Sequence, residues 1–95
     1  MSAIGQKLRK TQGGIILWCP ACHSGHEVKL GRNGWAWNNR DDSPTIIPSV
    51  YMSVGDWKCH CIVKDGRIEY LTDSTHDLRG KSVELPDWPF SGEPT

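Results

Sequence analysis

Two short cysteine-bearing stretches have the residue types and the spacing of a metal site. The first is Cys19-Pro20-Ala21-Cys22, and the second, much further along the chain, is Cys59-His60-Cys61. Two thiolates separated by two residues on a tight turn can bind one ion, and a Cys/His pair from a distant strand would complete the tetrahedron that zinc prefers. The sequence therefore predicts a structural zinc ion that holds the fold together.

The ligands supplied by the second stretch depend on the regularity of its strand. Along a regular strand Cys59 and Cys61 face one side and His60 the other, because strand side chains alternate. A regular strand thus favours a site of four cysteines, whereas a β-bulge would let Cys59 and His60 share the ion. His26, four residues after Cys22, is a further candidate ligand, or orients a ligand through a hydrogen bond.

His60, Asp73 and His76 form a second group of residues that could do chemistry. In the functional interpretation, zinc keeps an open position for water, His76 or His26 is a ligand, and Asp73 acts as base or orienter. In the structural interpretation, Asp73 caps a turn and His76 packs or forms hydrogen bonds locally.

Redox chemistry and disulfides are less favoured than a metal. A thioredoxin-like CxxC motif opens a substantial helix, whereas Gly25 and a strand-like run follow Cys22 within a few residues. Two disulfides would suit an exported protein, but the N-terminus lacks the apolar segment of a signal peptide.

Length and composition indicate the elements that position these residues. Ninety-five residues make one domain, and 10 Gly with 6 Pro suit short strands and turns. The sequence predicts a mostly β fold: a small antiparallel sheet or sandwich with a zinc knuckle and at most one short helical turn. We expect a flexible arm over residues 1–13, the zinc-stabilised β domain over 14–86, and an irregular tail over 87–95.

Apolar runs and turn signals indicate where the strands lie. Asp65-Gly66 predicts a tight hairpin turn, and Pro48 restricts its segment to a sheet edge or a bulge. At most a single helical turn is expected within 73–80. The expected strands are 15–18, 27–30, 35–38, 45–54, 57–63, 67–71 and 81–85.

Charge and aromatic content bear on the partner. The formal net charge is zero, so nucleic-acid binding is less favoured than a protein partner. An exposed surface of Trp35, Trp37, Asn38 and Arg40 would suit recognition of a protein, although tryptophans also fill small cores. No apolar run has the length of a membrane span, and we expect a cytoplasmic protein.

An ordered set of short motifs resembles a family of small uncharacterised phage and prophage proteins. Relatives in that family often carry an unsupported "ammonia monooxygenase" label. The resemblance covers about residues 15–89. It rests on CxxC followed by His26, Gly34-Trp35-Ala36-Trp37-Asn38, Pro44-Thr45, Pro48-Ser49-Val50, Cys59-His60, Asp65-Gly66-Arg67-Ile68, Asp73-x-Thr75-His76-x-Leu78-x-Gly80 and Leu85-Pro86.

The resemblance implies which residues belong to a shared pattern. Those residues are Cys19, Cys22, His26, Cys59, His60, Asp73 and His76. Cys61 is outside the pattern, which moves the preferred fourth ligand from Cys61 to His60 and requires the bulge. Cys61, His26 and His76 remain the alternates.

The predicted function is that of a zinc-stabilised binding module of phage or prophage origin. Its expected partner is a protein of the bacterial host or the phage, in an anti-defence or host-takeover role. The alternative is a small zinc-dependent hydrolase that uses Asp73 and His76.

Overall fold

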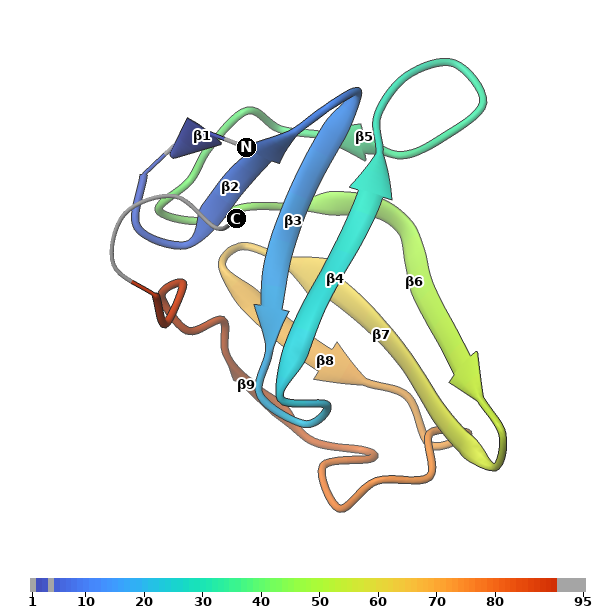
Figure 1. Ribbon diagram of the computed structural model, residues 1–95. Helices are drawn as coiled ribbons and strands as arrows, with labels where there is room; N and C mark the ends of the chain where they lie inside the picture. Colours follow the sequence, from blue (N-terminus) through green and yellow to red (C-terminus); the bar gives the residue numbers. More distant parts are fainter. Residues whose placement is uncertain (1, 4, 91–95) are drawn as a thin grey trace.

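Nine β-strands in two antiparallel sheets make up the protein in the computed structural model, which describes residues 2–3 and 5–90 (Figure 1). No helix occurs among these residues. The predicted mostly β, antiparallel fold is therefore confirmed, and of the two expected forms, a sheet or a sandwich, the structure has the sandwich. No described segment forms a helix long and apolar enough to cross a membrane.

The first sheet has four strands in the order of the sequence. They are β1 (Ser2–Ala3), β2 (Leu8–Thr11), β3 (Gly14–Cys19) and β4 (Ser24–Lys29). Burial in β3 and β4 follows a period of two, as expected of strands with one face on a core. The hairpin between β3 and β4 carries the Cys19–Cys22 turn at its tip, where the His23 N–H donates to the Cys19 carbonyl at 2.9 Å.

The second sheet has five strands, also in sequence order. They are β5 (Ala36–Trp37), β6 (Ile46–Val54), β7 (Trp57–Lys64), β8 (Arg67–Tyr70) and β9 (Ser82–Glu84). Asp65 and Gly66 have φ of 50° and 79° and form the predicted turn between β7 and β8. The register between β6 and β7 shifts between Ile46 and Val50, at the bulge expected around Pro48.

The core lies between the two sheets, which face each other across it (Figure 1). The first sheet contributes Leu8, Ile15, Leu17, Cys19 and Val28. The second sheet and the segment after it contribute Ile46, Val50, Cys59, Cys61, Val63, Ile68, Tyr70 and Leu85. Cysteines of both sheets are therefore core residues, and the sandwich brings them together.

Both ends of the chain are packed onto this sandwich where the structure describes them. The interval 1–13, expected to be an arm, contains β1 and β2, and Leu8 is fully buried. The interval 87–95, expected to be an irregular tail, includes Trp88, which is 8% exposed. The backbone N–H of Trp88 donates to the Gln6 carbonyl. The ring of Trp88 packs edge-on against Trp18 at 5.8 Å. Residues 91–95 lie outside the described part of the chain.

Candidate active site and metal centre

Three cysteines and one histidine converge inside the sandwich. They are Cys19 at the end of β3, Cys22 in the turn, His26 on β4 and Cys59 on β7. One ligand atom from each lies within 4.8 Å of all the others. The Sγ atoms of Cys19 and Cys59 are 3.9 Å apart, too far for a disulfide but close to the edge of about 3.8 Å in a tetrahedron of Zn–S bonds.

The regularity of β7 decides which of its residues join this group. Register pairs run without a break from Val50↔Cys61 to Val54↔Trp57, so no bulge interrupts Cys59 and His60. Cys59 and Cys61 accordingly point into the core, and His60 faces the opposite side of the sheet. The fourth member of the group is His26, whereas the sequence preferred His60 for that position.

Hydrogen-bond donors surround the sulfur atoms. The Tyr70 hydroxyl lies 3.1 Å from Cys19 Sγ, and Trp57 Nε1–H donates to Cys22 Sγ at 3.3 Å. The contact with Cys59 and burial raise the pKa of Cys19 to about 11, and burial raises the pKa of Cys22. The pKa of Cys59 is also raised: contact with Cys19 lowers it, but contact with Cys61 and burial outweigh that effect. A cation is what would favour the thiolate form here.

The donor set fits zinc. His26 is 4% exposed, and its Nε2 is buried without a hydrogen-bond partner, as expected for a nitrogen that binds an ion. Three sulfurs and one imidazole are a common set of ligands for structural zinc. An ion held here would cross-link the β3–β4 hairpin to β7, and so join the two sheets.

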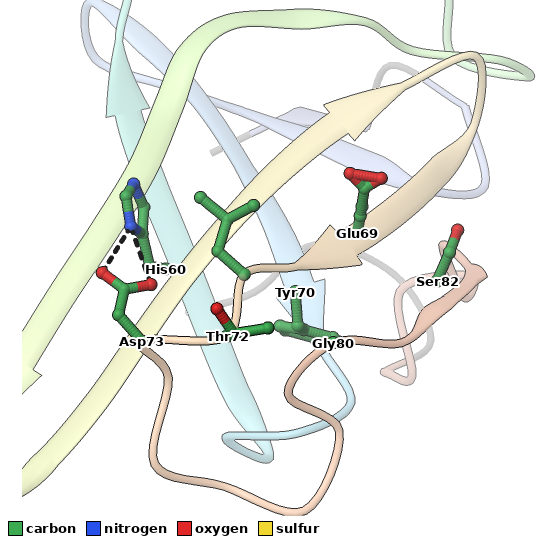
Figure 2. Close-up of a pocket in the computed structure, with 8 residues that line it drawn as sticks. His60, Glu69, Tyr70, Thr72, Asp73, Gly80 and Ser82 are labelled. Atoms are coloured by element: carbon green, nitrogen blue, oxygen red, sulfur yellow. Dashed lines mark hydrogen bonds and ion pairs between the residues drawn. The ribbon is translucent and has the colours of Figure 1, made fainter.

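A different set of polar side chains lies on the outer face of the second sheet. Ser49 on β6 and His60 on β7 are neighbours there, and Asp73 follows β8. The distance from His60 Nε2 to Ser49 Oγ is 3.0 Å. His60 Nδ1 lies 2.9 and 3.1 Å from the two carboxylate oxygens of Asp73 (Figure 2). This order of hydroxyl, imidazole and carboxylate is the arrangement that activates a serine nucleophile.

Backbone hydrogen bonds hold Asp73 beside His60. The segment after β8 runs along β7, where the Leu71 N–H donates to the His60 carbonyl at 2.8 Å. Ser74 Oγ accepts from the His60 N–H at 2.9 Å and donates to the His60 carbonyl at 3.2 Å. The Thr75 N–H donates to the Lys58 carbonyl at 3.0 Å. Asp73 therefore sits within a segment that is attached to the strand of its histidine.

A shallow hollow adjoins the His60–Asp73 pair (Figure 2). Its volume is about 570 Å³, and its lining comes from β7, β8, the segment after β8 and β9. The lining residues are His60, Glu69, Tyr70, Leu71, Thr72, Asp73, Gly80 and Ser82. Since β6 lies on the other side of β7 from β8, Ser49 is on the opposite side of His60 from this hollow.

The remaining predicted site residues lie elsewhere. Cys61 is fully buried in the core and outside the four-residue group. His76 is 4% exposed, and its ring packs 4.6 Å from Tyr70 and 5.6 Å from Trp57. It contacts neither Ser49 nor the Asp73 carboxylate in any hydrogen bond of the described residues.

The predicted binding surface is partly internal. Trp35 and Trp37 are half-buried and pack against the core. Trp37 Nε1–H donates to the Arg40 carbonyl at 3.0 Å, and Asn38 Oδ1 accepts from the Arg40 N–H at 3.2 Å. Arg40 is exposed and paired with Asp42 at 2.9 Å. These contacts shape the loop between β5 and β6.

Ser49 is the residue that sequence reasoning missed. The sequence groups His60 and Asp73 with His76 as acid–base candidates, and it gives Ser49, within the Pro48-Ser49-Val50 motif, no role. The missing signal was the pairing of β6 with β7, which places this serine on the face of His60.

Comparison with protein families supplies independent information on this arrangement. Residues 3–71, nearly three quarters of the chain, match the family of the bacterial ubiquitination-like system serine protease, BubE. The chain belongs to the BubE family. The matched residues include Ser49 and His60 and end just before Asp73. Comparison with curated proteins and with solved structures found no match. The phage and prophage origin suggested by the resemblance stays a prediction.

Proposed function

We propose that this protein is a serine peptidase with Ser49 as nucleophile, His60 as general base and Asp73 as the residue that orients His60. The observation that carries the proposal is the chain of contacts from Ser49 Oγ to His60 Nε2 at 3.0 Å and from His60 Nδ1 to Asp73 at 2.9 Å. The description of the BubE family as a serine protease supports it.

Each residue has a defined part in the reaction. Ser49 Oγ forms a bond to the carbonyl carbon of the substrate while His60 Nε2 takes the hydroxyl proton. Protonated His60 gives that proton to the leaving amine, which departs and leaves an acyl group on Ser49. Water, deprotonated by His60, then attacks the acyl carbon; the bond from that carbon to Ser49 Oγ breaks, and His60 returns the proton to Ser49 Oγ. Asp73 holds the imidazole with Nδ1–H toward the carboxylate, so that Nε2 is free to accept.

The metal centre has a separate, structural role in this proposal. Cys59 and His60 are adjacent on β7 but face opposite sides of the sheet. Zinc held by Cys19, Cys22, His26 and Cys59 would fix β7 to the β3–β4 hairpin in the interior. Its chemistry would be that of a cross-link with four protein ligands, and a small domain commonly needs one.

The proposal differs from both functions predicted from sequence. The proposed activity is hydrolysis rather than binding alone, because Ser49 has a base within hydrogen-bond distance. The nucleophile is a serine hydroxyl rather than zinc-bound water, and Asp73 works with His60 rather than His76. The substrate we propose is a protein component of a bacterial ubiquitination-like system, in keeping with the family description.

Reaction with a fluorophosphonate tests the nucleophile. The probe forms a covalent bond to an activated serine, and we expect mass spectrometry of the labelled protein to find the adduct on Ser49. His60→Ala should abolish labelling because the base is lost. Ser53→Ala is the matched control, since Ser53 is an exposed serine on the same strand and has no histidine partner among the described residues.

The result that would refute the proposal is equally specific. A folded, zinc-loaded wild-type protein that fails to react, or one that reacts at a serine other than Ser49, would exclude this triad as the active site. Labelling that persists in His60→Ala would exclude His60 as the base.

A further inference from the structure

The position of the base determines from which side a substrate reaches Ser49. His60 lies on β7, so its contact with Ser49 Oγ occupies the β7 side of the hydroxyl. The carbonyl carbon of the substrate must therefore approach Ser49 Oγ from a side that faces away from β7. The hollow beside Asp73 lies beyond His60, on the β8 side, and so does not meet this requirement. The sides that remain are the open face of the sheet above Ser49 and the outer edge of β6, and of these only the edge presents a row of backbone hydrogen-bonding groups.

That edge of β6 is open beyond Ser49, from Tyr51 onward. The neighbouring strand β5 has only two residues, and they pair with Ile46 and Ile47. No strand in the described part of the chain pairs with the outer side of β6 beyond that point (Figure 1). The Ser49 carbonyl faces this side, where it accepts a hydrogen bond from Trp35 Nε1–H at 3.3 Å.

The hairpin register determines which backbone groups the edge presents. The loop between Val54 and Trp57 has two residues. The Val54–Trp57 pair, and every second pair after it, therefore exchanges backbone hydrogen bonds within the hairpin. Tyr51 and Ser53 belong to the alternate pairs, and their N–H and C=O groups therefore point outward. Lys58 and His60, directly opposite them, likewise use their backbone groups on the far side of β7.

The side chains of this strand are unusually apolar for a surface. The exposed large hydrophobic residues of the described chain are Ile47, Tyr51, Val54, Trp57 and Phe90, and three of them belong to β6. Ile47 and Tyr51, 62% and 52% exposed, flank Ser49 two residues away on either side. Exposed apolar groups beside a reactive group are typical of a binding surface.

We propose that the outer edge of β6 binds an extended, unstructured polypeptide segment of the substrate as an added strand. The segment pairs with the outward N–H and C=O groups of Tyr51 and Ser53 and presents its scissile carbonyl to Ser49. Strand addition at an open edge is an established mode of peptide recognition. This inference rests on the proposed function and specifies its substrate class: a chain terminus or linker that is extended over about four residues, with apolar side chains near the cleaved bond.

The substitution Ser53→Pro tests the added strand. Proline removes the outward N–H of residue 53, and edge strands tolerate it where that N–H is not used by the sheet. The two substrates are a mixture of unstructured synthetic decapeptides and p-nitrophenyl acetate, which is too small to span the edge. We expect the ratio of kcat/KM for peptides to kcat/KM for the ester to fall by about tenfold or more in Ser53→Pro. Ser53→Ala, which keeps the N–H, should retain the wild-type ratio.

Backbone methylation of the substrate gives a second measurement on the unchanged protein, and it decides the question if Ser53→Pro does not fold. A peptide that the wild-type protein cleaves is resynthesised with one N-methyl group at each position in turn. An added strand uses every second N–H, so we expect cleavage to be lost at alternate positions only.

Several outcomes would overturn the inference while leaving the triad intact. A protein that forms the Ser49 fluorophosphonate adduct but cleaves no peptide in the mixture would overturn it, as would an unchanged ratio in Ser53→Pro or N-methyl effects without alternation. A concentration-dependent dimer that Ser53→Pro dissolves would assign the edge to a second copy of the chain. Failure of the Ser49 adduct itself would instead refute the proposed function.

Discussion

Replacing Asp73 with asparagine removes the negative charge beside His60 and keeps the size of the side chain. His60 becomes positively charged during acylation, so the variant loses that Coulomb attraction as well as the carboxylate that accepts from Nδ1–H. Two unit charges about 4 Å apart attract by about 1 kcal/mol in water and about 4 kcal/mol near a protein surface. The side chain of Asp73 is 59% exposed and that of His60 24%, which puts the pair between these limits. We therefore expect kcat/KM to fall by about 5-fold to 1,000-fold in Asp73→Asn.

The assay is hydrolysis of p-nitrophenyl acetate, followed together with the rate of fluorophosphonate labelling. Asp77→Asn is the matched control, because Asp77 is an exposed acid in the same segment and makes no hydrogen bond to His60 in the described structure. Thermal unfolding should be similar for the two variants, since neither carboxylate is buried. If Asp73→Asn reacts as fast as the wild type, Asp73 does not support His60 and the triad is reduced to Ser49 and His60.

Three further predictions concern the metal, the segment that holds Asp73, and pH. His26→Ala should lose bound zinc and become unstable to chelator, whereas His60→Ala should keep zinc while losing activity; metal analysis of both proteins checks this, and the reverse pattern would exclude the proposed ligand set. Ser74→Ala leaves the part-buried N–H of His60 without its partner, while the His60 carbonyl keeps the Leu71 N–H, so the free energy of unfolding should fall by about 1–3 kcal/mol. A loss of kcat should accompany it, because Asp73 is less firmly held; urea titration and ester hydrolysis measure the two effects, and full activity would contradict the positioning role. Burial, with a smaller effect of Arg79, lowers the pKa of His76, so below pH of about 6.5 the unfolded chain binds a proton that the folded protein excludes. Stability from this source is complete above that pH and is lost as pH falls below it, and His76→Gln should therefore show a weaker loss of stability between pH 7.5 and 5.5, by at most about 1.4 kcal/mol per pH unit; equal slopes in urea titrations would refute this.

Short sequence motifs predicted much of the fold. Asp65-Gly66 predicts a two-residue hairpin because this pair readily adopts positive φ, and the angles of 50° and 79° agree. Pro48 indicates a bulge or an edge because it lacks an N–H, and the register shift lies between Ile46 and Val50. The packed terminal segments escaped prediction, because β1 and β2 are short and depend on partners elsewhere in the chain.

The sequence by itself determined the class of fold and the cysteine knuckle, since both depend on residue types at short spacing. Only the tertiary structure decided which histidine serves which site. The sequence does not show which face of its strand His26 or His60 occupies relative to the other ligands. Those faces follow from the uninterrupted register of β7 and from the packing of the two sheets against each other. The same pairing brings Ser49 within 3.0 Å of His60, a proximity that residues on different strands acquire only when the strands pair.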